Sequence, residues 1–362
     1  MRIAIVCSSR YQLLNAINFA CSRANENCME EIDLFYSLPC LEDAQSIRSR
    51  IEDLGLFDDV ILFCNPDYGL EKYNRKMKTL RLLLLGGYAF NKLVIKGSPE
   101  KTYDVAMIPC AALQFDLFLA QYRPKRIWLF DDGIGSYQGN IIDATLSPLR
   151  KRMANLRGVS FEAEALYVNN ALMCSSLSSS CILQLPELNE RKIDLLRFVF
   201  ASGIDKEYRN DDWVYLELHE HGGGDSEHEL KNMIRQAHPD TIFRPHPATL
   251  ARSAADTPVQ NSGLWELICY DSISGENVLI GSVSTSLLTP KLLFDREPFV
   301  ILLYRLLDGG DDGRSVAGDK ILSMLKTGYS DTSKVFVPES LEELSDTLDY
   351  LNGLRCVESA SK

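Results

Sequence analysis

The stretch Thr241-Ile242-Phe243-Arg244-Pro245-His246-Pro247 joins a short β-type run to a histidine that lies between two prolines. Each proline fixes its own φ near about −65° and disfavours helical geometry in the residue before it. We therefore expect a stiff backbone to hold His246 at the carboxyl end of a strand. Ligands bind at that end in open α/β sheets, although a surface turn would also account for such a histidine.

A second stretch, Trp128-Leu129-Phe130-Asp131-Asp132-Gly133, has the same organisation, with an apolar strand followed by polar residues and a turn glycine. Either Asp131 or Asp132 is a candidate base for the proton of a bound hydroxyl group. A turn or helix-capping aspartate is the structural alternative. The two stretches together predict polar groups at the carboxyl ends of two separate strands.

Apolar strand candidates alternate with amphipathic helices along most of the chain, which is typical of α/β folds with parallel sheets. We expect strands at residues 3–7, 32–36, 60–64, 105–108, 126–130, 213–218, 241–243, 277–280, 298–304 and 334–337. Helices are expected at residues 11–23, 41–54, 70–85, 111–122, 227–237, 263–270, 320–326 and 341–351, with another ending at 294. The pattern loosens between residues 146 and 212, so a boundary within 161–211 is expected, dividing the chain into domains 1–185 and 186–362. Because the first turn lacks G-x-G-x-x-G, a dinucleotide site is not supported.

Composition limits the classes of protein to which the chain can belong. Its 362 residues suffice for about two domains, and its net charge of −12 disfavours a general nucleic-acid binder. The ten cysteines form no C-x-x-C pair, which indicates reduced thiols in a cytosolic protein. The first apolar run is too short for a signal peptide, and no run reaches the ~20 residues of a membrane span. We therefore expect a cytoplasmic location.

A phosphate-binding segment is predicted between the strand at 277–280 and the helix that ends at 294. The hydroxyls of Ser284, Thr285 and Ser286, with the N–H groups of the helix start, would form a phosphate cradle. Ordinary helix capping by these residues is the alternative. His246 has a side-chain type suited to proton transfer near neutral pH, and Arg244 adds positive charge beside it.

A metal site is a weaker interpretation of the histidine-rich region. All five histidines fall within 28 residues, at His219, His221, His228, His238 and His246. No third ligand has a recognisable spacing, H-E-x-x-H is missing, and the sequence contains no D-x-D. We therefore expect a mechanism without an obligatory metal. The run 222–224 is expected to be a glycine-rich loop, with Asp225 capping the next helix.

A basic stretch between Glu71 and Lys101 suggests contact with an anionic surface. It contains Lys72, Arg75, Lys76, Lys78, Arg81, Lys92, Lys96 and Lys101 around the apolar run 82–85. An anionic membrane or an anionic glycan would be attracted to it, so peripheral contact with the inner membrane face is expected. The solvated face of a core helix is the alternative.

The ordered motifs resemble those of bacterial sialyltransferases, most closely glycosyltransferase family 52, which includes lipooligosaccharide and capsule sialyltransferases. The matching segments are Asp131-Asp132-Gly133 for D/E-D/E-G, His246-Pro247 for H-P, Ser284-Thr285-Ser286 for the Ser/Thr pair and Gln12-Leu13-Leu14-Asn15-Ala16 for Q-L-L-N-A. The resemblance implies an α/β fold of the GT-B type, with two Rossmann-like domains facing across a cleft. It also implies an N-terminal acceptor-binding domain and a C-terminal domain that binds a CMP-sugar.

The resemblance further implies inverting, metal-independent transfer from CMP-sialic acid to a galactose-type hydroxyl of a bacterial surface glycan. Its catalytic residues would be Asp131 as base and His246 as the acid at the departing phosphate, with Asp132 and Asp225 as alternative bases. The donor would be bound by Arg244, Pro247, Glu266 (at the ribose), Ser284, Thr285 and Ser286, and the acceptor by Gln12 and Gly133. A second His-Pro pair at His238 is less favoured because it follows a predicted helix.

Two alternatives remain open at the level of the sequence. The chain could use another nucleotide sugar on the same fold, or bind glycans without catalysis. The sequence also leaves open the linkage formed, the acceptor, the register of the phosphate-binding residues and whether the chain forms a homodimer.

Overall fold

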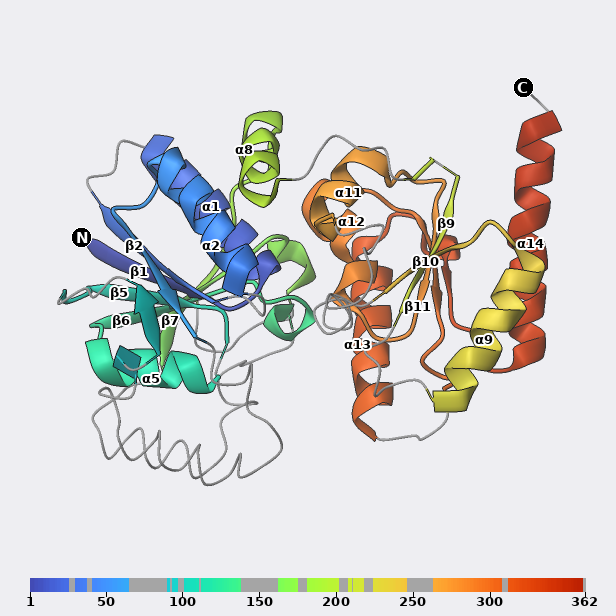
Figure 1. Cartoon of the computed structure of the whole chain (residues 1–362). Helices are drawn as coiled ribbons and strands as arrows, with labels where there is room; N and C mark the ends of the chain where they lie inside the picture. The colour runs from blue at the N-terminus through green and yellow to red at the C-terminus, as the bar shows by residue number, and fades with distance from the viewer. Residues whose placement is uncertain are drawn as a thin grey trace. The chain divides into compact units, whose positions relative to one another are not determined.

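The computed structural model divides the chain into two α/β units, Met1–Ser202 and Gly203–Lys362 (Figure 1). It describes residues 1–25, 30–37, 41–64, 90–91, 93–96, 101–110, 112–137, 162–174, 181–201, 208–209, 211–217, 224–245, 263–307 and 312–360. Each unit contains a parallel or nearly parallel sheet covered by helices on both faces. The expected α/β class with two Rossmann-like domains is therefore confirmed.

The sheet of the first unit has eight strands in the order β4-β3-β2-β1-β5-β6-β7-β8. The strands are β1 (Arg2–Cys7), β2 (Glu31–Tyr36), β3 (Asp59–Phe63), β4 (Val94–Lys96), β5 (Val105–Ile108), β6 (Arg126–Phe130), β7 (Ala163–Val168) and β8 (Cys181–Gln184). Only the edge strand β4 is antiparallel among the described strands. Without β4, the order follows the 3-2-1-4-5-6 doubly wound pattern, so the order reverses between β1 and β5, where ligands bind in such sheets.

Helices cover both faces of this sheet (Figure 1). One face carries α1 (Arg10–Asn25), α2 (Leu41–Leu54) and α8 (Glu190–Phe200), and the other carries α5 (Leu113–Tyr122). Because β1 and β2 are covered on both sides, every residue after the first of each strand is buried, and all of these residues except Asp33 are apolar. On the α5 side, the ring of Phe35 packs edge-on against Phe118, with 4.9 Å between the ring centroids.

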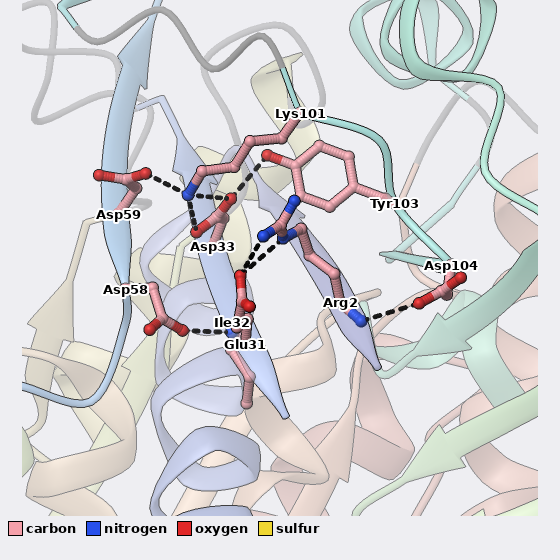
Figure 2. Close-up of polar contacts among 9 residues, drawn as sticks. All are labelled: Arg2, Glu31, Ile32, Asp33, Asp58, Asp59, Lys101, Tyr103 and Asp104. Atoms are coloured by element: carbon pink, nitrogen blue, oxygen red, sulfur yellow. Dashed lines mark hydrogen bonds and ion pairs between the residues drawn. The ribbon is translucent and has the colours of Figure 1, made fainter. Parts of the chain in front are cut away.

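Charged residues join the strands at the amino-terminal edge of the first sheet (Figure 2). The ammonium group of Lys101 lies 3.1 Å from Asp33 and also pairs with Asp59, while Tyr103 donates a 2.7 Å hydrogen bond to Asp33. Asp33 is fully buried, so Lys101 supplies the counter-ion of a buried carboxylate. Lys101 is part of the basic stretch that was expected to contact an anionic surface. In the structure its ammonium group pairs with Asp33 and Asp59 of the first sheet.

The second unit contains a five-stranded sheet in the order β10-β9-β11-β12-β13, with every described pair parallel. Its strands are β9 (Trp213–Leu216), β10 (Ile242–Arg244), β11 (Val278–Gly281), β12 (Phe299–Leu302) and β13 (Val335–Phe336). The helices are α9 (Gly224–Ala237) and α14 (Leu341–Ala360) on one face, and α11 (Trp265–Ser272), α12 (Thr289–Phe294) and α13 (Asp312–Gly328) on the other (Figure 1). The order 2-1-3-4-5 reverses between β9 and β11, which predicts the ligand-binding end of this unit.

The boundary between the units lies later than the expected division between residues 185 and 186, although it falls within the expected range 161–211. The reason is α8, which packs against α1 and α2. Lys192 of α8 donates a 2.8 Å hydrogen bond to Ser22, and Arg50 of α2 donates a 2.6 Å hydrogen bond to the Val199 carbonyl. The sequence pattern also missed β4, β7 and β8, and it placed the start of α13 too late.

Candidate functional site

Strand β6 ends at the motif Asp131-Asp132-Gly133, at the carboxyl edge of the first sheet. Gly133 has a φ of 93°, which glycine adopts without steric cost, and its N–H donates a 2.8 Å hydrogen bond back to Asp131 Oδ1. The backbone N–H of Asp132 donates to Ser136 Oγ at 2.7 Å. The motif is therefore a tight turn that directs two adjacent carboxylates into different surroundings. The structure shows Gly133 forming this turn, and its expected contact with the acceptor stays a prediction.

Asp131 is the centre of a buried hydrogen-bond network. Its side chain is 0% exposed and accepts hydrogen bonds from Gly133, from the Tyr137 hydroxyl, and from both the backbone and the side chain of Asn169. The Asn15 side chain donates a 3.1 Å hydrogen bond to the Asp131 carbonyl. Burial raises the pKa of Asp131, and the four donors oppose that rise. These contacts give Asp131 a structural role at the position expected to hold the base.

Asp132 is half-buried, and the residues that contact its carboxyl group follow β1 and β5, the two strands between which the strand order reverses. Its Oδ1 accepts a hydrogen bond from Gln12 Nε2, and the Cys110 thiol donates to the same carboxyl group. Burial raises the pKa of Asp132, the two donors oppose the rise, and the nearby charge of Asp131 adds to it. A partly exposed carboxylate with a raised pKa is a suitable general base.

Gln12 uses both ends of its amide group inside the protein. Its Oε1 accepts a 2.6 Å hydrogen bond from the backbone N–H of Ser8, while its Nε2 donates to Asp132. The start of α1 fixes the residue, because Ser9 Oγ accepts a 3.1 Å hydrogen bond from the Gln12 N–H. Gln12 is 4% exposed and orients Asp132, and its predicted contact with the acceptor stays a prediction.

Arg244 ends β10 at the carboxyl edge of the second sheet. Its guanidinium donates to the Tyr208 hydroxyl at 3.1 Å and to the Gly263 carbonyl at 2.5 Å, and it lies 5.3 Å from the centroid of the Trp265 ring. Arg244 is buried, so these contacts hold a positive charge in a fixed position at this edge.

Glu266 lies in the first turn of α11 and is 8% exposed. Burial raises its pKa to about 7, against the effects of its own backbone N–H and of the Arg244 charge. The carboxyl group therefore changes charge near neutral pH. In that range it can accept or donate hydrogen bonds to a diol.

The segment after β11 has a different geometry from the expected phosphate cradle. Ser284 caps the 3₁₀ turn Thr285–Leu287, and its Oγ accepts a 3.2 Å hydrogen bond from the Ser286 N–H. The N–H groups of Leu287 and Leu288 donate to the carbonyls of Ser284 and Thr285. The turn itself therefore uses the N–H groups of Ser286, Leu287 and Leu288, and phosphate binding by the hydroxyls of this segment stays a prediction. Thr285 and Ser286 are half-buried side chains on this turn.

Ser282 precedes the predicted phosphate-binding residues in the chain and was not expected to belong to the site. It follows β11 directly, beside the reversal of strand order, and is 3% exposed. Among the described residues its Oγ has no hydrogen-bond partner. The signal in the sequence is its position as the first hydroxyl after an apolar strand.

Several predicted site residues lie outside the described part of the chain, namely His246, Pro247, His219, His221 and most of the basic stretch 71–101. Asp225 is the second residue of α9, which begins at Gly224, so it lies inside the helix and not at the expected cap. His238 follows α9, and its ring stacks on Trp213 with 4.5 Å between the centroids. The described residues contain no cluster that could hold a metal ion. In the same residues, no helix has the length and apolar character needed to cross a membrane.

No protein-family model matches the chain, and no curated protein matches its sequence. Among solved structures, the chain is similar to the UDP-GlcNAc 2-epimerase from Neisseria meningitidis bound to UDP-GlcNAc, with 12% identity and a TM-score of 0.43 over 97% of this chain and 100% of that chain. It is similar to the glycosyltransferase VinC in complex with dTDP, with 13% identity and a TM-score of 0.48 over 97% and 91%. It is also similar to the glycotransferase of kitacinnamycin, with 9% identity and a TM-score of 0.49 over 97% and 90%. The assignment of two Rossmann-like units rests on the strand order of the chain itself.

Proposed function

We propose that the chain is an inverting glycosyltransferase of the GT-B type that moves sialic acid from CMP-sialic acid to a galactose-type hydroxyl of a bacterial surface glycan, in lipooligosaccharide or capsule. The observation that carries the proposal is the half-buried Asp132, which is oriented by Gln12 at the carboxyl edge of the first sheet. The choice of donor is supported by the order of the D-D-G, H-P and Ser/Thr motifs in the sequence.

In this mechanism Asp132 accepts the proton of the acceptor hydroxyl while that oxygen attacks the anomeric carbon of the sialic acid. The geometry favours Asp132 over Asp131, because Asp131 is fully buried and already accepts four hydrogen bonds. The raised pKa of Asp132 makes its carboxylate a stronger proton acceptor. Attack from the side opposite the leaving group inverts the anomeric centre.

The second unit would bind the donor and stabilise the departing CMP. The bond between the anomeric carbon and the phosphate oxygen breaks with its electron pair on the phosphate, and His246 would donate a proton there. Hydroxyl groups of Thr285, Ser286 and Ser282 are the candidate phosphate donors, and Glu266 is the candidate ribose contact. CMP carries one phosphate, so hydroxyls and an imidazolium can stabilise its charge in place of a metal.

Nucleotide specificity is tested first by thermal unfolding of the purified protein with CMP, UDP or GDP in the presence of EDTA. A ligand that binds only the folded state stabilises it by about 2.7 kcal/mol at a hundred times its Kd. We expect stabilisation by CMP. Stabilisation by UDP or GDP alone would overturn the donor, and no response to any of the three would favour a non-catalytic glycan-binding protein.

Turnover is tested by CMP release from CMP-sialic acid in the presence of lactose. We expect the wild type to release CMP and form a sialylated product whose anomeric configuration is inverted, as read by NMR. Release that is equal with and without acceptor would indicate hydrolysis, and it would contradict the transfer reaction.

A further inference from the structure

The reversal of strand order in the first sheet brings together two residues from separate segments of the chain. Ser8 follows β1, and Gln114 lies in the first turn of α5, after β5. Both are buried, with exposed fractions of 8% and 3%. Gln114 Nε2 donates a 3.4 Å hydrogen bond to Ser8 Oγ. These residues adjoin Asp132, because Ser8 also contacts Gln12, whose amide orients the Asp132 carboxylate.

The direction of each hydrogen bond in this group is fixed by a backbone N–H. The N–H of Ser8 can only donate, so the Gln12 atom that it contacts at 2.6 Å is the amide oxygen. The Ser8 hydroxyl donates to the same oxygen at 3.3 Å and therefore accepts from Gln114. It follows that Gln114 contacts Ser8 with its NH₂ group and directs its carbonyl oxygen elsewhere.

That carbonyl oxygen, Oε1 of Gln114, is buried and has no hydrogen-bond partner in the described part of the chain. A buried acceptor without a partner is costly, and such atoms in folded proteins usually bind water or a ligand. Oε1 can only accept a hydrogen bond, and so can the Asp132 carboxylate, which is connected to Gln114 through the hydrogen bonds of Ser8 and Gln12. The pair matches a ligand with two hydrogen-bond donors. A sugar with two hydroxyl groups satisfies this requirement, whereas an anion would be repelled.

We propose that Gln114 is a specificity-determining residue that accepts a hydrogen bond from a second hydroxyl of the acceptor sugar, while Asp132 accepts the proton of the reacting hydroxyl. The inference rests on the proposed glycosyltransferase function and narrows its acceptors to polyols. An alcohol with a single hydroxyl would leave the Gln114 oxygen without a partner.

The test compares lactose with a set of lactosides that each lack one galactose hydroxyl, using the wild type and the variants Gln114→Met and Gln121→Met. Gln121 is a half-buried glutamine in the last turn of the same helix, so its variant controls for the loss of an amide from α5. In the wild type, we expect the enzyme to depend on one galactose hydroxyl in addition to the reacting one. Removal of that second hydroxyl should lower kcat/KM about tenfold to a hundredfold. In Gln114→Met that penalty disappears, and in Gln121→Met it remains.

Equal penalties in the wild type and in Gln114→Met would overturn the proposal and would indicate that Gln114 binds only water. If Gln114→Met does not fold, the test rests on the wild type with the same lactosides. The proposal is then overturned if removal of the reacting hydroxyl is the only change that lowers kcat/KM. If the wild type transfers no sugar at all, the proposed function fails. The proposed role of Gln114 is then tested by measuring binding of the same lactosides with ligand-observed NMR. If the lactosides do not bind, the proposal is overturned.

Discussion

At the scale of single residues, the two aspartates at the end of β6 differ sharply in environment although they are adjacent in sequence. Asp131 lies in a network of buried donors, and Asp132 is partly exposed. The difference arises because successive residues at a strand end point to different sides, and only one side is covered by Tyr137 and Asn169. Identity of side-chain type therefore does not imply identity of role.

Asparagine at each position should separate the two roles. We expect Asp132→Asn to lower kcat by about 10²–10⁴-fold with little change in melting temperature, because a base is lost from a partly exposed position. Asp131→Asn should destabilise the fold by about 2–4 kcal/mol, since an NH₂ group then faces buried donors. Kinetics and thermal unfolding of both variants check this. A stable, inactive Asp131→Asn variant with an active Asp132→Asn variant would restore Asp131 as the base.

Gln12→Met should change the pH dependence of the reaction. The hydrogen bond from Gln12 stabilises the Asp132 carboxylate and opposes the rise in its pKa, so its loss raises the pKa further. Because the base acts when deprotonated, the acid limb of the kcat/KM profile should move to higher pH. A variant with lower kcat and an unmoved acid limb would mean that Gln12 acts by packing alone.

At the scale of elements, one half-buried carboxylate connects α12, β12 and the end of α13 in the second unit. Glu297, between α12 and β12, pairs with Lys291 at 2.5 Å and accepts hydrogen bonds from Ser330 after α13. Burial by itself would raise the pKa of Glu297, but the bonds from Lys291 and Ser330 outweigh it and lower the pKa to about 2. The ionised form is therefore favoured by folding.

Glu297→Gln should destabilise the protein in a manner that depends on pH. The folded-state pKa lies below the usual value of 4.5, so the stabilisation is fully present above pH 4.5 and is lost as the pH falls toward 2. We expect a deficit of about 2–3 kcal/mol at pH 7 that shrinks at pH 3. Urea unfolding at both values measures it. A deficit that is constant with pH would indicate lost packing.

The charged network of Figure 2 gives an element-scale prediction for the first unit. Lys101→Met removes the counter-ion of the fully buried Asp33, so we expect destabilisation of about 2–4 kcal/mol at pH 7. Burial raises the pKa of Asp33, and Lys101 opposes this rise. In the variant, which lacks Lys101, Asp33 should take up a proton as the pH falls, and the loss of stability should then become smaller. The matched control is Lys125→Met, because the exposed Lys125 pairs with Asp104 at the same edge. Equal stability of the two variants would contradict a structural role for Lys101.

At the scale of the whole molecule, the two units have sheets with different strand orders, and each order defines its own ligand-binding end. The proposed division of labour places acceptor groups in the first unit and donor groups in the second. Hydrogen exchange measured with and without CMP tests the division. We expect slower exchange at residues 281–288 and at the start of α11, and unchanged exchange at β6. Protection confined to the first unit would reverse the assignment.

The sequence alone determined the α/β class, most of the strands, and the placement of D-D-G and Ser/Thr residues at strand ends, because buried parallel strands produce continuous apolar runs bounded by polar turns. Only the tertiary structure decided which of the two aspartates is partly exposed. Asp132 is hydrogen-bonded to Gln12 and Asp131 to Asn169, and in both pairs the two residues are far apart in the sequence. It also decided the unit boundary, through packing of α8 on α1 and α2. Burial and hydrogen-bond partners depend on residues distant in sequence, and a local pattern of residue types does not contain them.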